Sequence, residues 1–260
     1  MVEGKRPKFP TEVISLPSKG KLYSKESSIS NGEIEIKYMT AREEDILTSQ
    51  NLIRKGIVID KLLESLIVDS SINLNEILIG DKNALMVASR ILGYGKNYEF
   101  EVNCPSCNER NTDTIDLSKL GNKDVDYSMF KSAVNEFEFV LPASKRKITY
   151  KILTQLDERE IDTELKALKK VSAGSNIDHE VTTRLKRSIL SVDGNSDKNS
   201  INGFVENEFL SRDSLAFRNH LIKITPDVDM EYLFTCELCG FEQEVTVPMT
   251  VQFFWPTAKK

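Results

Sequence analysis

Two Cys-x-x-Cys pairs constrain this 260-residue chain more than any other feature. Cys104 and Cys107 form the first pair, Cys236 and Cys239 form the second, and the chain contains no other cysteine. A Cys-x-x-Cys turn directs two thiolates at one point, so two such turns supply the four ligands of a tetrahedral structural zinc site. The spacing therefore predicts one structural zinc ion, held by all four cysteines and joining two distant parts of the chain.

Each cysteine pair lies between two short segments with the residue types of β-strands. Residues 98–102 and 230–234 precede the pairs, and residues 112–117 and 243–247 follow them. Strand, turn and strand, given twice, is typical of a zinc ribbon. Four reduced cysteines or two redox motifs are the alternatives, but a thioredoxin-like site begins a helix and neither pair precedes a helical pattern. Four protein ligands leave no coordination position open, so we expect the ion to stabilise the fold without catalysing a reaction.

The composition is that of a chain able to fold around its own core in water. It is 40% hydrophobic and 29% charged, and its net charge of -5 gives no general attraction to nucleic acid. No apolar run approaches the roughly 18 residues of a membrane span, and no signal peptide opens the chain. We therefore expect a reducing cytoplasm, which favours metal thiolates over disulfides.

Helical and strand patterns are mixed along the chain, which predicts an α+β fold. Residues 33–39 alternate between apolar and polar side chains, as a half-buried strand does. Thr40 with Glu43 forms a capping box, which begins a helix that ends at Gly56. Residues 1–32 are expected to be an extended basic arm, either a solvated tail or a docking arm for an acidic partner.

The second half of the chain repeats features of the first. The capping residue Thr154 lies 114 residues after Thr40. The separation is 132 residues both from Asp81 to Asp213 and from Cys104 to Cys236. The loop-like residues 172–178 and 193–202 can hold the 18 additional residues. We interpret the chain as two tandem related α+β repeats joined by the shared four-cysteine site; chance matching of short patterns is the alternative. The predicted domains are an arm (1–32), a first repeat (33–120), a linker (121–138), a second repeat (139–250) and an aromatic tail (251–260).

The tail holds three consecutive aromatic residues, Phe253, Phe254 and Trp255, and Trp255 is the only tryptophan. We expect these residues to form a strand. The strand would either pack on the second repeat beside the zinc ribbon or present Phe254 and Trp255 to a neighbouring subunit, since tryptophan is enriched at interface hot spots. The three aromatics are therefore the candidate partner-binding residues.

No set of residues has a catalytic spacing. His179 and His220 lack a nearby serine, cysteine or second histidine, and Gly93-Tyr94-Gly95 lacks the third glycine of a dinucleotide-binding loop. We therefore predict a protein that is not an enzyme.

Three further segments carry a family resemblance. Leu16-Pro17-Ser18-Lys19-Gly20 precedes an alternating strand that ends in Met39-Thr40 and then an acidic helix, and residues 207–218 and 253–256 add a helical run and an aromatic ending. In these features the chain resembles the baseplate hub subunits of T-even-type contractile-tailed phages. The resemblance implies a non-enzymatic role in building the central hub, through contacts with other hub proteins, in the cytoplasm of the host bacterium. A virion component and an assembly factor absent from the finished particle both fit it.

A zinc-ribbon protein that binds nucleic acid, such as a transcription accessory factor, is the rival interpretation. It predicts basic and aromatic residues around the cysteine turns, to neutralise phosphates and stack on bases. Residues 227–250 instead contain six acidic residues and no lysine or arginine, and only Arg110 lies near the first turn. We therefore expect neither nucleic acid nor a membrane as a partner.

Overall fold

The computed structural model describes residues 10–131, 133–171, 178–249 and 251–255, and it confirms the α+β class. The helices are combined with four small antiparallel sheets, of which three have two strands and one has three. The first half contains, in chain order, β1 (Thr11–Ser15), β2 (Glu33–Lys37), α1 (Ala41–Thr48), α2 (Gln50–Lys55), α3 (Val58–Leu66), η1 (Leu74–Glu76), α4 (Ile79–Tyr94), β3 (Asn97–Asn103) and β4 (Arg110–Asp116).

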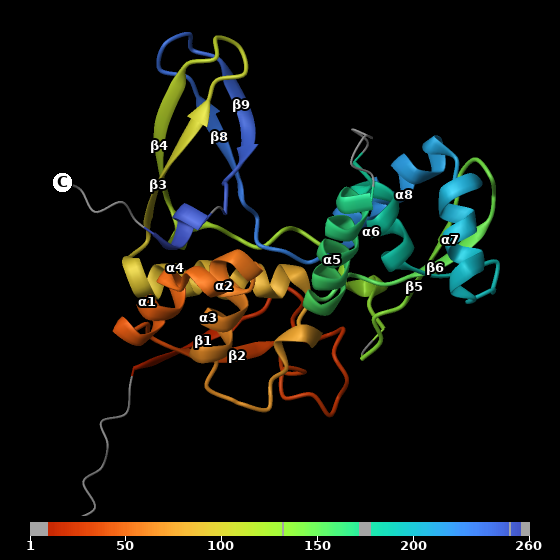
Figure 1. The fold of residues 1–260 in the computed structure, drawn as a ribbon, viewed down its shortest axis with the longest axis horizontal. Coiled ribbons are helices and arrows are strands. Elements are labelled where there is room, and N and C mark those ends of the chain that lie inside the picture. The colour runs from red at the N-terminus through yellow and green to blue at the C-terminus, as the bar shows by residue number, and fades with distance from the viewer. Residues whose placement is uncertain (1–9, 132, 172–177, 250, 256–260) are drawn as a thin grey trace, which may run out of the picture.

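The rest of the chain begins with two short 3-10 helices, and it ends with a β-hairpin followed by a last 3-10 helix. Its elements are η2 (Leu117–Lys119), η3 (Tyr127–Met129), β5 (Phe137–Val140), β6 (Lys147–Tyr150), α5 (Gln155–Val171), α6 (Glu180–Ser188), β7 (Ile189–Val192), α7 (Lys198–Asn207), α8 (Ser211–Ile224), β8 (Glu231–Thr235), β9 (Glu242–Thr246) and η4 (Val251–Phe254). In Figure 1 the β3–β4 and β8–β9 hairpins stand side by side above α4, while α5 to α8 form a separate group.

The described part of the expected arm is folded into the first half, so the expectation of an extended arm over residues 10–32 was wrong. β1 pairs with β2 in antiparallel register, with Ile14 opposite Ile34. Between these strands the chain buries Leu16, Leu22, Tyr23 and Ile29. The physical reason is that these apolar side chains cover the core even though turn residues surround them. Residues 1–9 of the arm lie outside the described residues.

The start of the first helix agrees with the sequence. The backbone N–H of Thr40 donates to Glu43 Oε2 at 2.9 Å, which confirms the capping box. The expected single helix is instead two, because the chain is extended at Ser49 between α1 and α2. Gly56 ends α2 with a φ of 70°, a left-handed conformation that glycine adopts without strain.

The two halves share a buried boundary. The backbone N–H of Gln155 donates to the Ile77 carbonyl at 2.8 Å, and its side-chain Nε2 lies 3.0 Å from both carboxylate oxygens of Asp60. Lys82 Nζ donates to the same carboxylate at 2.7 Å. Val125 and Phe130, within the expected linker, are also buried in the common core. The halves therefore pack through one continuous core rather than through a free linker.

Two aspartates, one in each half, make similar contacts at the start of a long helix. Asp81, on the first turn of α4, accepts a hydrogen bond from the Ser18 backbone N–H at 2.9 Å. Asp213, on the first turn of α8, accepts from the backbone N–H groups of Ala143 and Ser144 at 2.6 and 2.9 Å. Each aspartate thus ties a long helix to the Leu-Pro loop that precedes its own half's second strand.

None of the helices in the described ranges has both the length and the apolar character needed to cross a membrane.

Candidate metal centre

The cysteines lie at the turns of two hairpins that pack against each other. β3 pairs with β4 and β8 with β9 in antiparallel register, and side-chain alternation places the aromatic residues of β3 and those of β8 each on one face of their hairpin. Phe100 of the first hairpin meets Tyr232 of the second edge to face, with ring centroids 5.3 Å apart. This packing brings the two turns together at the end farthest from α4 (Figure 1). The strand, turn and strand expected around each pair are therefore present.

The two turns have the same backbone geometry. In the first, the N–H of Cys104 donates to the Glu109 carbonyl at 2.8 Å, and the N–H of Asn108 donates back to the Cys104 carbonyl at 2.8 Å. In the second, the Cys236 N–H donates to Phe241 and the Gly240 N–H donates to Cys236, both at 2.9 Å. Asn108 and Gly240 both adopt positive φ, at 60° and 69°. Glycine and asparagine are the residues that adopt this conformation most readily, so each sequence suits its turn.

The four sulfur atoms form a compact cluster. All lie within 4.8 Å of one another, and the Cys104–Cys239 and Cys107–Cys236 Sγ pairs are each 3.7 Å apart. A disulfide requires about 2.05 Å, so no pair is bonded. Four sulfurs placed about 2.3 Å from a tetrahedral zinc ion would lie about 3.8 Å apart. The residues therefore fit a four-coordinate metal ion, as their spacing predicted.

Asn111 supports the cluster from β4, and sequence reasoning missed it. Its Nδ2 lies 3.7 Å from Cys236 Sγ, and its Oδ1 accepts the Glu237 backbone N–H at 3.0 Å. The side chain is 6% exposed and connects the first hairpin to the second turn. A single asparagine in a polar strand gives no sequence signal for such a contact. Hydrogen bonds of this kind orient metal ligands and tune their basicity.

Two of the thiols, those of Cys236 and Cys107, have pKa values shifted in opposite directions. The backbone N–H of Cys239, with that of Leu238, lowers the pKa of Cys236 to about 6. The Glu109 N–H acts in the same direction on Cys107, but desolvation and the three neighbouring sulfurs outweigh it and raise the pKa of Cys107 to about 12. A metal ion binds cysteine as the thiolate, so metal binding is expected to release protons.

The aromatic tail folds against the base of the first hairpin. Residues 251–254 form the 3-10 helix η4, so the strand expected there was wrong. Phe253 and Phe254 are fully buried, and Phe253 meets Tyr98 of β3 edge to face with centroids 4.9 Å apart. Burial of two consecutive aromatics requires both to face inward, which an alternating strand does not allow. The partner-binding role of Phe253, Phe254 and Trp255 stays a prediction. Of these three side chains, only that of Trp255 is partly exposed to solvent. Residues 256–260 lie outside the described residues.

His220, on α8, lies among aromatic side chains. Its Nε2 lies 2.6 Å from the Tyr150 hydroxyl, and its ring stacks on Phe139 with centroids 4.6 Å apart. Desolvation lowers the pKa of His220, with a smaller contribution from Lys223. His220 is thus a packed, hydrogen-bonded residue on α8, outside the two hairpins that carry the cysteines.

In a comparison with known proteins, a family model described as T4 bacteriophage base plate protein matches residues 9–255. The matched range includes both halves of the fold and all four cysteines. No curated protein and no solved structure matches the chain.

Proposed function

Because the chain belongs to the T4 bacteriophage base plate protein family, we propose that it is a non-enzymatic structural or assembly protein of the central baseplate hub. It acts through contacts with other baseplate and hub proteins, which it meets in the cytoplasm of the infected bacterium and, as a virion component, in the tail baseplate. The family match over residues 9–255 carries this proposal, because it spans both halves of the described fold.

The metal part of the proposal is one structural zinc ion, bound by Cys104, Cys107, Cys236 and Cys239. The tetrahedral fit of the sulfur cluster supports zinc, as does the all-thiolate donor set. A bound zinc ion would supply cross-linking of the two hairpins and no open coordination position. The protein's own residues do the rest, since Asn111 orients the second turn and the Phe100–Tyr232 contact holds the hairpins together.

The two halves are, we infer, related copies of one α+β unit. Support comes from contacts that recur at matching places. Lys37 pairs with the capping-box Glu43 at 3.3 Å, and Lys151 pairs with Asp157 at 2.7 Å in the corresponding position of the second half. The helix-start aspartates Asp81 and Asp213 and the two cysteine turns add two further recurring features.

The hub proposal is tested by mass spectrometry of purified phage particles and of baseplate-hub intermediates isolated from infected cells. We expect the chain in the hub intermediates, and in finished particles as well if it is a virion component. A chain found in neither fraction, while other baseplate proteins are detected there, would contradict the proposal.

A further inference from the structure

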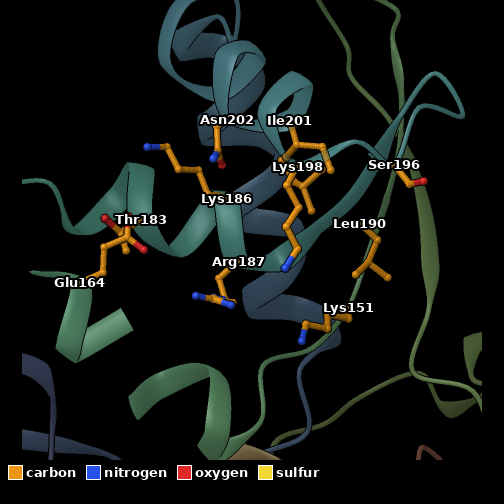
Figure 2. A pocket seen from close by; sticks show the side chains of 11 residues that line it. Lys151, Glu164, Thr183, Lys186, Arg187, Leu190, Ser196, Lys198, Ile201 and Asn202 are labelled. Atoms are coloured by element: carbon orange, nitrogen blue, oxygen red, sulfur yellow. The ribbon is translucent and has the colours of Figure 1, made fainter. Parts of the chain in front are cut away.

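The second half contains a basic cavity that the proposed function has not used. It has a volume of about 310 Å³ and lies between α6, α7, β7 and the segment that follows β6. Four cationic side chains line it, Lys151, Lys186, Arg187 and Lys198, against one carboxylate, Glu164. Figure 2 shows the ends of Lys151, Arg187 and Lys198 directed toward the same space, while Lys186 extends to one side. Three separate segments of the chain thus place positive charge around one hollow.

The cations of this cavity keep hydrogen-bond donors unused. Lys151 pairs with Asp157 at 2.7 Å, Lys186 pairs with Glu206 at 2.5 Å, and Arg187 pairs with Glu160 through one of its terminal nitrogens. None of these three carboxylates lines the cavity. An ammonium group has three N–H donors and a guanidinium has five, so each cation can accept a further anion.

The Lys198 side chain makes no hydrogen bond or ion pair within the described residues, unlike the side chains of the other three cations. It is the first residue of α7, whose N-terminus is already capped by the Asp197 carboxylate, so the Lys198 amino group and not the helix end supplies the positive charge here. An anion in the cavity would therefore have at least one cation that it need not share.

The surroundings strengthen these charges. Ile189 and Ile201 form a buried apolar lining, and the Lys186 and Arg187 side chains are 19% and 30% exposed. Charges that are partly shielded from water interact more strongly with a bound anion than fully exposed surface charges do. The cavity volume is at the lower end of the roughly 300–1,000 Å³ of ligand pockets, so the cavity can hold a few side chains of a bound ligand.

We propose that this cavity binds an acidic peptide segment, with two or more neighbouring Asp or Glu side chains, from another baseplate protein. The source of the peptide rests on the proposed function, whereas the preference for carboxylates rests on the site. Three of its cations already bind carboxylates one at a time, with single contacts. A nucleic acid is a poorer occupant, because none of the residues that line the cavity is aromatic and could stack on a base.

The binding test uses a labelled hexaglutamate peptide, with a hexaglutamine peptide and a single-stranded oligonucleotide as comparison probes. Fluorescence anisotropy should show salt-dependent binding of hexaglutamate alone. Lys198→Gln and Arg187→Gln should each raise its Kd about fivefold, the size expected for one partly exposed ion pair. Lys61→Gln is the matched control, since Lys61 lies on α3 and pairs with Glu64. Because Lys198 has no partner to leave unpaired, its variant should keep the wild-type melting temperature.

Three binding results would overturn the proposal: equal Kd for Lys198→Gln and Lys61→Gln, equal binding of hexaglutamine, or tighter binding of the oligonucleotide. Salt-dependent self-association of the wild-type protein, lost in Lys198→Gln, would also overturn it, because the occupant would then be a second copy. Co-assembly separates this inference from the proposed function. If wild-type and Lys198→Gln protein join baseplate intermediates equally, the cavity inference is wrong and the hub proposal stands. If wild-type protein joins none but still binds hexaglutamate, the hub proposal fails alone.

Discussion

Cys104 Sγ and Cys239 Sγ lie 3.7 Å apart although 135 residues separate them in the chain. The second cross-pair, Cys107 and Cys236, has the same separation. Each close contact joins the hairpin of the first half to the hairpin of the second, so an ion bound by these sulfurs would connect both halves. Near the turns the hairpins also share a small apolar cluster, in which four partly buried side chains pack against Cys104, Phe234 and Cys236: Val102, Tyr232, Phe241 and Val245.

Loss of one buried cysteine should destabilise both hairpins together. Cys104→Ser and Cys236→Ser remove ligands from different halves, and either should lower the melting temperature by roughly 10 °C for a domain of this size. The loss should stay below the roughly 10 kcal/mol that zinc contributes to isolated zinc-finger peptides, because this chain has its own core. Calorimetry gives the melting temperature, and Ser106→Ala, in the same turn but without a sulfur ligand, is the control. Unequal effects, with one variant close to wild type, would argue against a shared ion.

The boundary between the halves depends on the carboxylate of Asp60. Asp60→Ala would leave Lys82, whose side chain is 13% exposed, without its partner, and would remove the acceptor of Gln155 Nε2. Breaking such a partly buried pair costs about 3 kcal/mol of the free energy of unfolding. Urea denaturation measures this value, with Asp45→Ala on the exposed face of α1 as the control. A cost below that of the control would show that the halves do not depend on this contact.

Asp213 should make stability pH-dependent in the acid range. Burial alone would raise the pKa of its carboxyl, but the backbone N–H groups of Ala143 and Ser144 outweigh burial and lower it. A folded-state pKa below the unfolded value of about 3.9 stabilises the protein above that pH, and the stabilisation is lost as the pH falls through the folded pKa. The difference in free energy of unfolding between wild type and Asp213→Asn should therefore be largest at neutral pH and shrink below about pH 4. A difference that is constant from pH 7 to pH 3 would contradict this origin.

The tail aromatics should separate folding from assembly. Phe254→Ala empties a fully buried site and should cost about 3–5 kcal/mol of the free energy of unfolding. Trp255→Ala should cost less, since Trp255 keeps an accessible surface, and it should weaken co-assembly with hub proteins if Trp255 binds a partner. Thermal melting and co-assembly are measured on both variants. Full assembly by a Trp255→Ala protein that is also less stable than wild type would identify Trp255 as a core residue alone.

Local chemistry explains which parts of the fold could be predicted. The spacing of the four cysteines was enough to predict the two cysteine turns, since four soft ligands in two short motifs have few functions other than metal binding. The capping residues Thr40 and Thr154 could also be predicted, because each lies only three residues before the carboxylate that accepts its backbone N–H.

Other features depend on contacts between distant residues. The β1 strand was missed because its pairing depends on β2, which lies 18 or more residues farther along the chain. Its own five residues do not indicate that partner. The 3-10 helix of the tail follows from burial of Phe253 and Phe254, which local pattern does not show. Asn111 and the basic cavity likewise combine side chains from separate elements, so no single stretch of sequence indicates them.

Metal content tests the central claim, that the four cysteines hold one zinc ion which joins the halves. Protein purified under reducing conditions without added metal is analysed by inductively coupled plasma mass spectrometry, and its free thiols are titrated before and after addition of a chelator. We predict one zinc ion per chain, with the four thiols protected until the chelator removes the metal. Well-folded protein with no bound metal and four reactive thiols would contradict the account.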